Sequence, residues 1–357
     1  MVDLSRSQMK KSSKVLKSCK RIEDIDTESI EYQNAVIWRG KHLAPLFEVF
    51  RMVNEAVASI EGIVVTMRLK RMKSILSKLL REDKEYDIST MEDIGGCRVI
   101  CEDIESMRRC FDCVKSAFGK EIKVRDYVTK PKGSGYRCVH IIVKHQWEDR
   151  NYHFEIQIRT RLQHIWATGI ENIGVLYGED FKSPGSNANR EHYIDPIMMC
   201  LSSIFALEER SAVIDGYTTD YRELCQRLNK SLENAQAHGF DLIKDLQAGA
   251  EGFTLLPSNF GKDPYILLLC VDSQNQVGKF IDFGQDSLEQ ALDKYGQIEV
   301  AYTGTKYEGT NHSEQGSWDN AVLVAASDFS DISKIYPNYT ISTQELLQKL
   351  NEYSSHK

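Results

Sequence analysis

Apolar and polar residues alternate strictly over residues 152–159, in the stretch YHFEIQIR. This period of two predicts a β-strand with one apolar face and one face that carries an acid, an amide and a guanidinium. Thr160 follows and can cap a helix in which His164, Ala167 and Glu171 share one side. A polar row beside a helix start favours phosphate or metal chemistry over a plain solvent-facing surface.

The rest of the first half of the chain mixes short strand patterns with helix patterns. The expected helices cover residues 30–60 (one helix or a pair), 74–80 and 103–118, and the expected strands cover 60–66, 97–101 and 138–145. A loop rich in Lys, Pro and Gly, residues 129–135, precedes the last of these strands. Together these patterns predict an α/β (α+β) fold, in which a mixed β-sheet is flanked by helices.

The pattern changes after residue 178. Residues 182–190 are polar and contain Pro, Gly, Ser and Asn, which is typical of a linker. Helices are expected at 193–214, 217–246, 288–295 and 343–353, and buried strands at 265–271 and 321–326. We therefore expect a basic N-terminal segment, a mixed α/β domain, a polar linker with helices, and a separate C-terminal α/β domain, at residues 1–28, 29–180, 181–250 and 251–357.

Composition narrows the class of protein. Of 357 residues, 41% are apolar and 27% are charged, as in soluble globular proteins. No apolar run reaches the roughly 18 residues of a transmembrane helix, and the N-terminus does not resemble a signal peptide. The nine cysteines are irregularly spaced, which indicates reduced thiols in the cytoplasm. Cys110 and Cys113 form a single CxxC, and packing is a better interpretation for it than zinc binding.

The formal net charge of −7 does not favour nucleic-acid binding by the chain as a whole. Two regions are nevertheless basic. Residues 10–21 suit a solvated, poorly ordered tail, with a contact to RNA or lipid as the alternative. Residues 68–81 lie within a helical pattern, so their cations are harder to explain as solvation alone.

Residues 68–78 are the first of four segments with candidate chemistry. If a strand ends near Lys70 and a helix starts after it, Arg68, Lys70, Ser74 and Lys78 can face one cleft. Cations beside a helix N-terminus form a polyphosphate site. A Lys-rich helix that is merely solvated is the alternative.

The second segment, residues 91–100, and the fourth segment, residues 154–171, each contribute an acid. Asp93 precedes a Gly-Gly turn into a strand that carries Arg98, and an acid at a strand edge can hold Mg²⁺ with waters and phosphates. A turn-forming role is the alternative for Asp93. If the two strands are neighbours, Glu155 lies across from Asp93, so both can share one Mg²⁺. Glu155 can also serve as the base for a hydroxyl nucleophile.

The third segment is the loop before Tyr136, which contains Lys130, Lys132, Ser134 and Gly135. Glycine lets the backbone approach a ligand closely. An aromatic ring after such a loop can stack on a nucleobase, which contributes on the order of 1–3 kcal/mol. A hairpin turn with a core tyrosine is the alternative interpretation.

The four segments together resemble the synthetase domain of the RelA/SpoT family, enzymes of alarmone metabolism. The resemblance rests on EIQIRT followed by His and WA, and on DY…PK…SGY…H, and it covers residues 35–178. The IGGCR turn and the WRGKHLAPLF segment resemble the stand-alone branch of the family. We find no hydrolase-type, ribosome-binding or TGS-like segment, so the resemblance implies a nucleotidyltransferase-like synthetase domain without hydrolase activity.

The resemblance also implies roles for single residues. Asp93 and Glu155 would hold Mg²⁺, and Glu155 would assist deprotonation of the acceptor 3′-hydroxyl. The residues implied to bind the phosphates of the donor ATP are Arg68, Lys70, Ser74, Lys78 and Arg98. The residues implied on the acceptor side are Arg125, Lys132, Ser134, Tyr136, His140, Gln157, Arg159, His164, Ala167 and Glu171, with Tyr136 stacked on the base.

The implied reaction moves the β,γ-pyrophosphate of ATP to the 3′-hydroxyl of GDP or GTP and makes (p)ppGpp. Ser134, Gly169 and Asn172 depart from the family pattern near the acceptor side. Two alternatives therefore stay open. One is the same chemistry on an adenine nucleotide or on the tRNA 3′ end, as in a growth-inhibiting toxin or phage-defence effector. The other is an inactive domain that senses nucleotides.

Residues 217–357 contain no motif that we can connect to chemistry. We expect them to act in regulation, through a partner or a homo-oligomer, and we expect no membrane contact.

Overall fold

The computed structural model describes residues 4–82, 85–177, 188–251, 254–255, 265–272, 277–283, 288–302, 320–326 and 341–355. The strands are β1 (Val64–Leu69), β2 (Gly95–Cys101), β3 (Ile122–Asp126), β4 (Val139–Trp147), β5 (Arg150–Thr160), β6 (Thr254–Leu255), β7 (Tyr265–Asp272), β8 (Val277–Asp282) and β9 (Asn320–Ala326). The helices are α1 (Arg6–Ser18), α2 (Ile30–Gly40), α3 (Leu43–Val57), α4 (Met72–Leu79), α5 (Ile104–Phe118), α6 (Arg161–Tyr177), α7 (Ala188–Glu208), α8 (Tyr221–Ala237), α9 (Leu242–Glu251), α10 (Leu288–Tyr302) and α12 (Ile341–Ser354). Short 3₁₀ turns lie at Ile22–Asp24 and Ile88–Thr90.

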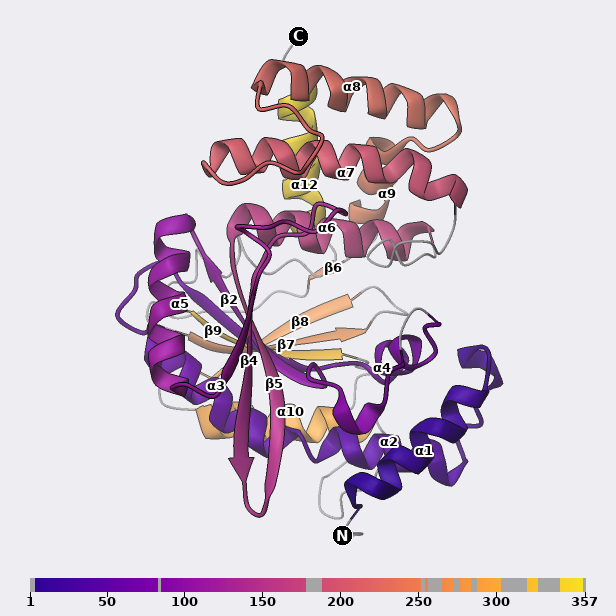
Figure 1. Cartoon of the computed structure of the whole chain (residues 1–357), viewed down its shortest axis with the longest axis vertical. Coiled ribbons are helices and arrows are strands. Elements are labelled where there is room, and N and C mark those ends of the chain that lie inside the picture. Colours follow the sequence, from indigo (N-terminus) through magenta and orange to yellow (C-terminus); the bar gives the residue numbers. More distant parts are fainter. Residues whose placement is uncertain are drawn as a thin grey trace.

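The described strands form one sheet of nine strands in the order β3-β4-β5-β2-β1-β9-β7-β8-β6. The pairs β2–β5 and β6–β8 are parallel, and the remaining pairs are antiparallel. Helices flank this sheet (Figure 1). The predicted mixed α/β fold is therefore confirmed.

Most elements expected in the first half are present, with boundaries shifted by a few residues. Over the whole described chain three strands were missed, β3, β6 and β8. In β3 all five residues are at least partly exposed, because it is the edge strand, so its sequence lacks an apolar face. The single helix expected over 217–246 is two helices, α8 and α9, separated at Gly239, whose φ is +88°.

One face of the sheet packs against α3, α5 and α10. The apolar residues of the alternating pattern point to this face, among them Met67, Val99, Ile156, Leu268 and Leu323. All five side chains are at most 1% exposed. The period-two pattern thus fixes which residues remain for the opposite face.

The C-terminal strands are not a separate unit, which corrects our expectation for the described residues. β9 pairs with β1, with Val64 opposite Ala326, and β7 pairs with β9. The run AVLVAA at 321–326 is apolar on both faces, as suits a strand inside a large sheet. Such a run indicates burial but does not indicate which strand lies beside it, and for that reason the expectation was wrong.

The basic N-terminal segment is also better ordered than we expected. α1 begins with a capping box at Ser5, and its side chains Met9 and Leu16 are buried. They share a core with residues of α2 and α4. Lysines cover the exposed side of α1, and they obscured its apolar stripe in the sequence.

A second apolar core lies between α6, α7, α8, α9 and α12. These helices stack above the sheet in the view of Figure 1. α6 continues directly from β5, so it joins this helical layer to the sheet. No helix in the described part of the chain combines the length and the apolar content that crossing a membrane requires.

Candidate active site

A polar row crosses five strands on the sheet face opposite α3 and α5. The register aligns Arg125 of β3, His140 of β4, Gln157 of β5, Arg98 of β2 and Thr66 of β1, each beside the next. Residues at one register position project to the same face of a sheet. The strand order therefore brings together residues that lie far apart in the sequence.

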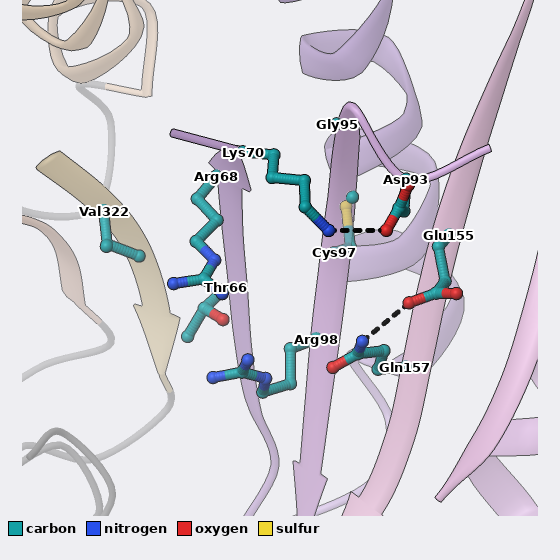
Figure 2. A pocket seen from close by; sticks show the side chains of 11 residues that line it. Thr66, Arg68, Lys70, Asp93, Gly95, Cys97, Arg98, Glu155, Gln157 and Val322 are labelled. Atoms are coloured by element: carbon teal, nitrogen blue, oxygen red, sulfur yellow. Dashed lines mark hydrogen bonds and ion pairs between the residues drawn. The ribbon is translucent and has the colours of Figure 1, made fainter. Parts of the chain in front are cut away.

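A cavity opens on this face next to the row (Figure 2). Residues from β1, β2, β5 and β9 line it, with Lys70 and Asp93 from the segments beside β1 and β2. The lining residues are Thr66, Arg68, Lys70, Asp93, Gly95, Gly96, Cys97, Arg98, Glu155, Gln157 and Val322. The structure thus brings together six of the residues that the sequence singled out, namely Arg68, Lys70, Asp93, Arg98, Glu155 and Gln157.

Asp93 lies between two lysines at one end of the cavity. Lys70 Nζ donates to Asp93 Oδ2 and Lys78 Nζ donates to Asp93 Oδ1, each at 2.7 Å. Burial alone would raise the pKa of Asp93, but the two ammonium groups lower it to about 2. Asp93 is therefore ionised at neutral pH. Arg68 makes no hydrogen bond or ion pair with the described residues, so its guanidinium is available to a ligand.

Gly95 and Gly96 are the first two residues of β2 and not the turn that we expected, and they let β2 run close beside β5. A Cβ on Gly96 would collide with the carbonyl oxygen of Glu155, and one on Gly95 would come within 3.0 Å of the Phe154 ring. Only glycine fits this approach without a shift of backbone or ring. The glycine pair therefore sets the position of Glu155 relative to Asp93.

Glu155 is held by a chain of hydrogen bonds. His140 Nδ1 lies 2.9 Å from Glu155 Oε2, Gln157 Nε2 donates to Glu155 Oε1 at 2.7 Å, and Tyr136 Oη lies 2.8 Å from His140 Nε2. Burial alone would raise the pKa of Glu155, but the contact with His140 lowers it. Burial lowers the pKa of His140, but Cys138 and Glu155 outweigh it and raise this pKa to about 9. The pair is therefore an imidazolium beside a carboxylate at neutral pH.

The loop before Tyr136 is a tight turn. Gly135 N donates to Lys132 O at 2.8 Å, and Gly135 has φ +92°, which favours glycine. Lys132 Nζ lies 4.5 Å from the ring centroid of Tyr127 and 4.9 Å from that of Tyr136. The predicted stacking ring thus carries a cation in this structure. Sequence reasoning did not single out Tyr127, although it belongs to the DY pair quoted above.

Helix α7 holds this loop from the other side. Ser202 Oγ donates to Gly135 O at 2.6 Å and accepts from Arg137 Nε at 2.9 Å. The Trp166 ring of α6 lies edge-on to Tyr136 with centroids 6.3 Å apart. The helical layer therefore holds the conformation of the loop before Tyr136.

The remaining predicted residues lie outside the cavity lining. Ser74 is exposed on α4, and Arg125 Nη2 donates to Glu92 Oε2 at 2.7 Å. The α6 side chains of His164 and Ala167 are 3% and 1% exposed. The roles of these residues, and those of Lys132, Ser134, Arg159 and Glu171, stay predictions.

Two of the departures on α6 contact helix α12. A Cβ on Gly169 would lie 2.7 Å from Leu346 Cδ2, and Asn172 Nδ2 donates to Thr343 Oγ1 at 3.0 Å. Arg161 and Glu345 form an ion pair across the same interface. Both departures therefore have a structural explanation, which is the close packing of the C-terminal helix.

Sequence reasoning missed three other lining residues, Thr66, Cys97 and Val322. Thr66 precedes Arg68 by two positions, so the alternation of a strand could have indicated it. Nothing in the sequence near Val322 points to a site. Its place in the cavity follows from the pairing of β9 with β1.

The donor set suits Mg²⁺. This ion takes oxygen ligands, and it is usually held by one or two carboxylates together with substrate phosphates and waters. Asp93 and Glu155 provide two carboxylates whose pKa values are lowered. In the part of the chain that the structure describes, no group of three or more His, Cys, Asp or Glu side chains forms a metal site. Substrate phosphates would therefore have to complete the coordination.

Part of this chain is similar to known proteins. A family model described as a region found in RelA / SpoT proteins matches residues 67–179. GTP pyrophosphokinase YwaC of Bacillus subtilis is 28% identical over 200 residues, which cover 51% of this chain and 95% of YwaC. GTP pyrophosphokinase YjbM of the same organism is 34% identical over 121 residues, which cover 32% of this chain and 56% of YjbM.

Among solved structures, small alarmone synthetase 1 from Bacillus subtilis bound to pppGpp is similar at 22% identity and a TM-score of 0.40. The match covers 51% of this chain and 94% of that chain. The family model spans the second half of β1 and all elements from α4 to α6, and it leaves out the strands and helices that follow. Residues 67–179 therefore match the region found in RelA / SpoT proteins, and the chain is similar to enzymes named GTP pyrophosphokinase.

Proposed function

We propose that this protein transfers the β,γ-pyrophosphate of ATP to the ribose 3′-hydroxyl of GDP or GTP, so that the 3′-oxygen bonds to the β-phosphorus and AMP leaves. The observation that supports this most directly is the composition of the cavity. Cations from β1, β2 and the segment after β1 lie at one end, and the Glu155 carboxylate lies between them and the loop that carries Tyr136. A polyphosphate donor and a nucleoside acceptor would meet at Glu155.

The cationic end suits the donor. Arg68 makes no hydrogen bond or ion pair with any described residue. Lys70 and Lys78 each donate to Asp93, and Lys78 Nζ also lies 5.3 Å from the centroid of the Tyr86 ring. ATP phosphates would accept hydrogen bonds from these ammonium groups, and Asp93 would then be released toward a metal ion. Fixed cations stabilise the charge that develops on a transferred phosphoryl group without reorganisation of solvent.

Mg²⁺, when held by Asp93 and Glu155, would supply charge neutralisation at the ATP phosphates. The protein's own residues have the other tasks. The imidazolium of His140 and the amide of Gln157 orient Glu155. The Glu155 carboxylate would accept the proton of the acceptor hydroxyl. The Tyr136 ring would position the acceptor base once Lys132 moves from its face.

The test is a transfer assay. Purified protein and Mg²⁺ are incubated with ATP labelled in its terminal phosphates and with GDP, GTP, ADP, ATP or bulk tRNA, each alone. We expect label on GDP or GTP, and a loss of at least about a hundredfold with Glu155→Gln, since general-base contributions are about 10²–10⁴-fold. Glu121→Gln is the matched control, because that side chain is 81% exposed.

The other outcomes separate the alternatives. Label on tRNA or on an adenine nucleotide would contradict the guanine acceptor and retain the chemistry. The ordered basic side of α1 is the observation that favours RNA as the second candidate. ATP binding without transfer to any acceptor would support a nucleotide sensor. A fully active Glu155→Gln protein would contradict the proposed base.

A further inference from the structure

Strand β1 has different partners along its two edges. Toward β2 its pairing runs the full length of the strand, from Val64 opposite Ile100 to Leu69 opposite Gly95. Toward β9 the pairing covers Val64 to Met67 and ends there. The last residues of β1 thus lie beside β9 without being paired to it, at the point where Arg68 and Val322 line the cavity.

The backbone N–H groups at this end of β1 are nevertheless satisfied. Lys70 N donates to Ile94 O at 2.7 Å, on the β2 side. Neighbouring N–H groups of a strand point to opposite edges, so Leu69 N points away from β2. It donates to the hydroxyl oxygen of Tyr295 at 3.0 Å. A side chain therefore occupies the place of the missing strand partner.

Tyr295 is rigidly placed. It lies on α10, is 0% exposed, and belongs to the core beneath the sheet. The Phe47 ring of α3 packs edge-on against it, with centroids 6.3 Å apart. A buried aromatic held in this way is a stable anchor for the backbone group that it binds.

The anchored residue lies between two cations of the donor site. Arg68 precedes Leu69 and lines the cavity, and Lys70 follows it and binds Asp93. We infer that Tyr295 is a positioning residue for the ATP side of the site, through its hydrogen bond to Leu69. This inference rests on the proposed function for the identity of the ligand. Tyr295 lies outside residues 67–179, so it adds a part to the site that the family region lacks.

Tyr295→Phe tests this inference, since it removes only the hydroxyl group. The matched control is Tyr353→Phe, which removes a hydroxyl that is equally buried but binds Glu208 in the helical layer. Two quantities are measured on the full chain: the Kd for ATP with Mg²⁺ by calorimetric titration, and KM for ATP and for the acceptor. Thermal unfolding shows that each variant is folded.

We expect Tyr295→Phe to raise the Kd and KM for ATP about three- to tenfold, with the acceptor KM unchanged. Tyr353→Phe should lower the melting temperature without changing the ATP Kd. Equal ATP binding by Tyr295→Phe and wild type would overturn the inference, and so would equal losses for both substrates. If Tyr295→Phe does not fold, Phe47→Leu loosens the same contact and must show the same selective loss.

The titration also separates the inference from the proposed function. Weaker ATP binding by Tyr295→Phe, in a protein that transfers label to no acceptor, would retain the inference and contradict only the proposed reaction. If the wild type transfers label and Tyr295→Phe binds ATP as tightly as the wild type, only the inference is contradicted. A wild type that does not bind ATP would overturn both.

Discussion

The row of side chains that crosses the sheet through Thr66 changes from polar to apolar between β1 and β9. On the β1 side it contains His140, Gln157, Arg98 and Thr66. It continues across β9 and β7 as Val324 and Leu267, both 0% exposed. On this face the strands β3, β4, β5, β2 and β1 (the polar half) therefore present polar side chains, and β9 and β7 (the apolar half) present apolar ones.

This difference shows that the chemical motif and the structural unit have different boundaries. The residues that mark the family end at 179, but the sheet that holds them extends to residue 326. Substitutions in the two halves should therefore differ in kind. Those in the apolar half should abolish folding, and those in the polar half should leave the fold intact and weaken substrate binding.

The largest effect is expected from a charge in the apolar half. Val324→Asp puts a carboxylate where the side chain is 0% exposed, which costs several kcal/mol against a total stability of about 5–15 kcal/mol. We expect little soluble, folded protein, measured by yield and circular dichroism. Val124→Asp is the control, since Val124 of β3 is 40% exposed. Equal damage by both variants would remove the distinction between the two halves.

A selective effect is expected in the polar half. Arg68→Gln removes from the cavity a cation that makes no hydrogen bond or ion pair with the described residues. One charge-assisted hydrogen bond is worth about 1.5–3 kcal/mol. The KM for ATP should rise at least about tenfold, because about 1.4 kcal/mol corresponds to a factor of ten. The melting temperature should match that of wild type, as should that of Arg109→Gln on the exposed side of α5. An unfolded Arg68→Gln protein would contradict this separation of roles.

A smaller effect is expected where α12 packs on α6. Gly169→Ala gains helix propensity of about 1 kcal/mol, but the new methyl group must fit 2.7 Å from Leu346 Cδ2. Overpacking costs about 1–3 kcal/mol, so we expect a net destabilisation of about 1 kcal/mol in chemical denaturation. Gly40→Ala, which has open space around it in α2, should instead stabilise the protein. Stabilisation by Gly169→Ala would show that the α6–α12 contact is looser than described.

The smallest expected effect is a dependence of the melting temperature on pH through His140. His140 contacts Tyr136, Tyr127, Cys138 and Glu155, and the net result raises its pKa to about 9. An unfolded histidine titrates near 6.5. The stabilisation from the charged pair is therefore fully present below about pH 6.5 and is lost as the pH rises through about 9.

Melting temperatures measured from pH 6 to 10 test this expectation. The wild type should lose a few degrees relative to His140→Gln over that range. Parallel curves for the two proteins would contradict the charged pair.

The sequence predicted the polar half well because its signals are local. The alternation around Glu155 and the glycine pair at 95–96 describe strands and turns that depend on neighbouring residues. The pairing of β9 with β1 and the contact of Tyr295 with Leu69 join residues that are far apart in the chain. Apolar runs indicate that these segments are buried but not where, so Val322 and Tyr295 could not be placed in advance.

The pairing of β9 with β1 has a consequence for synthesis of the protein. Protein synthesis adds about 5–20 residues per second, so residues 64–160 leave the ribosome several seconds or more before Ala326. Strand β1 has no β9 to pair with during this interval. During that time β1 is an open edge strand, which is prone to pair with other chains. Neither Val322 nor Tyr295 has yet reached the cavity and strand β1. On the proposed function, a nascent chain would therefore lack part of its ATP site until residue 326 has been made.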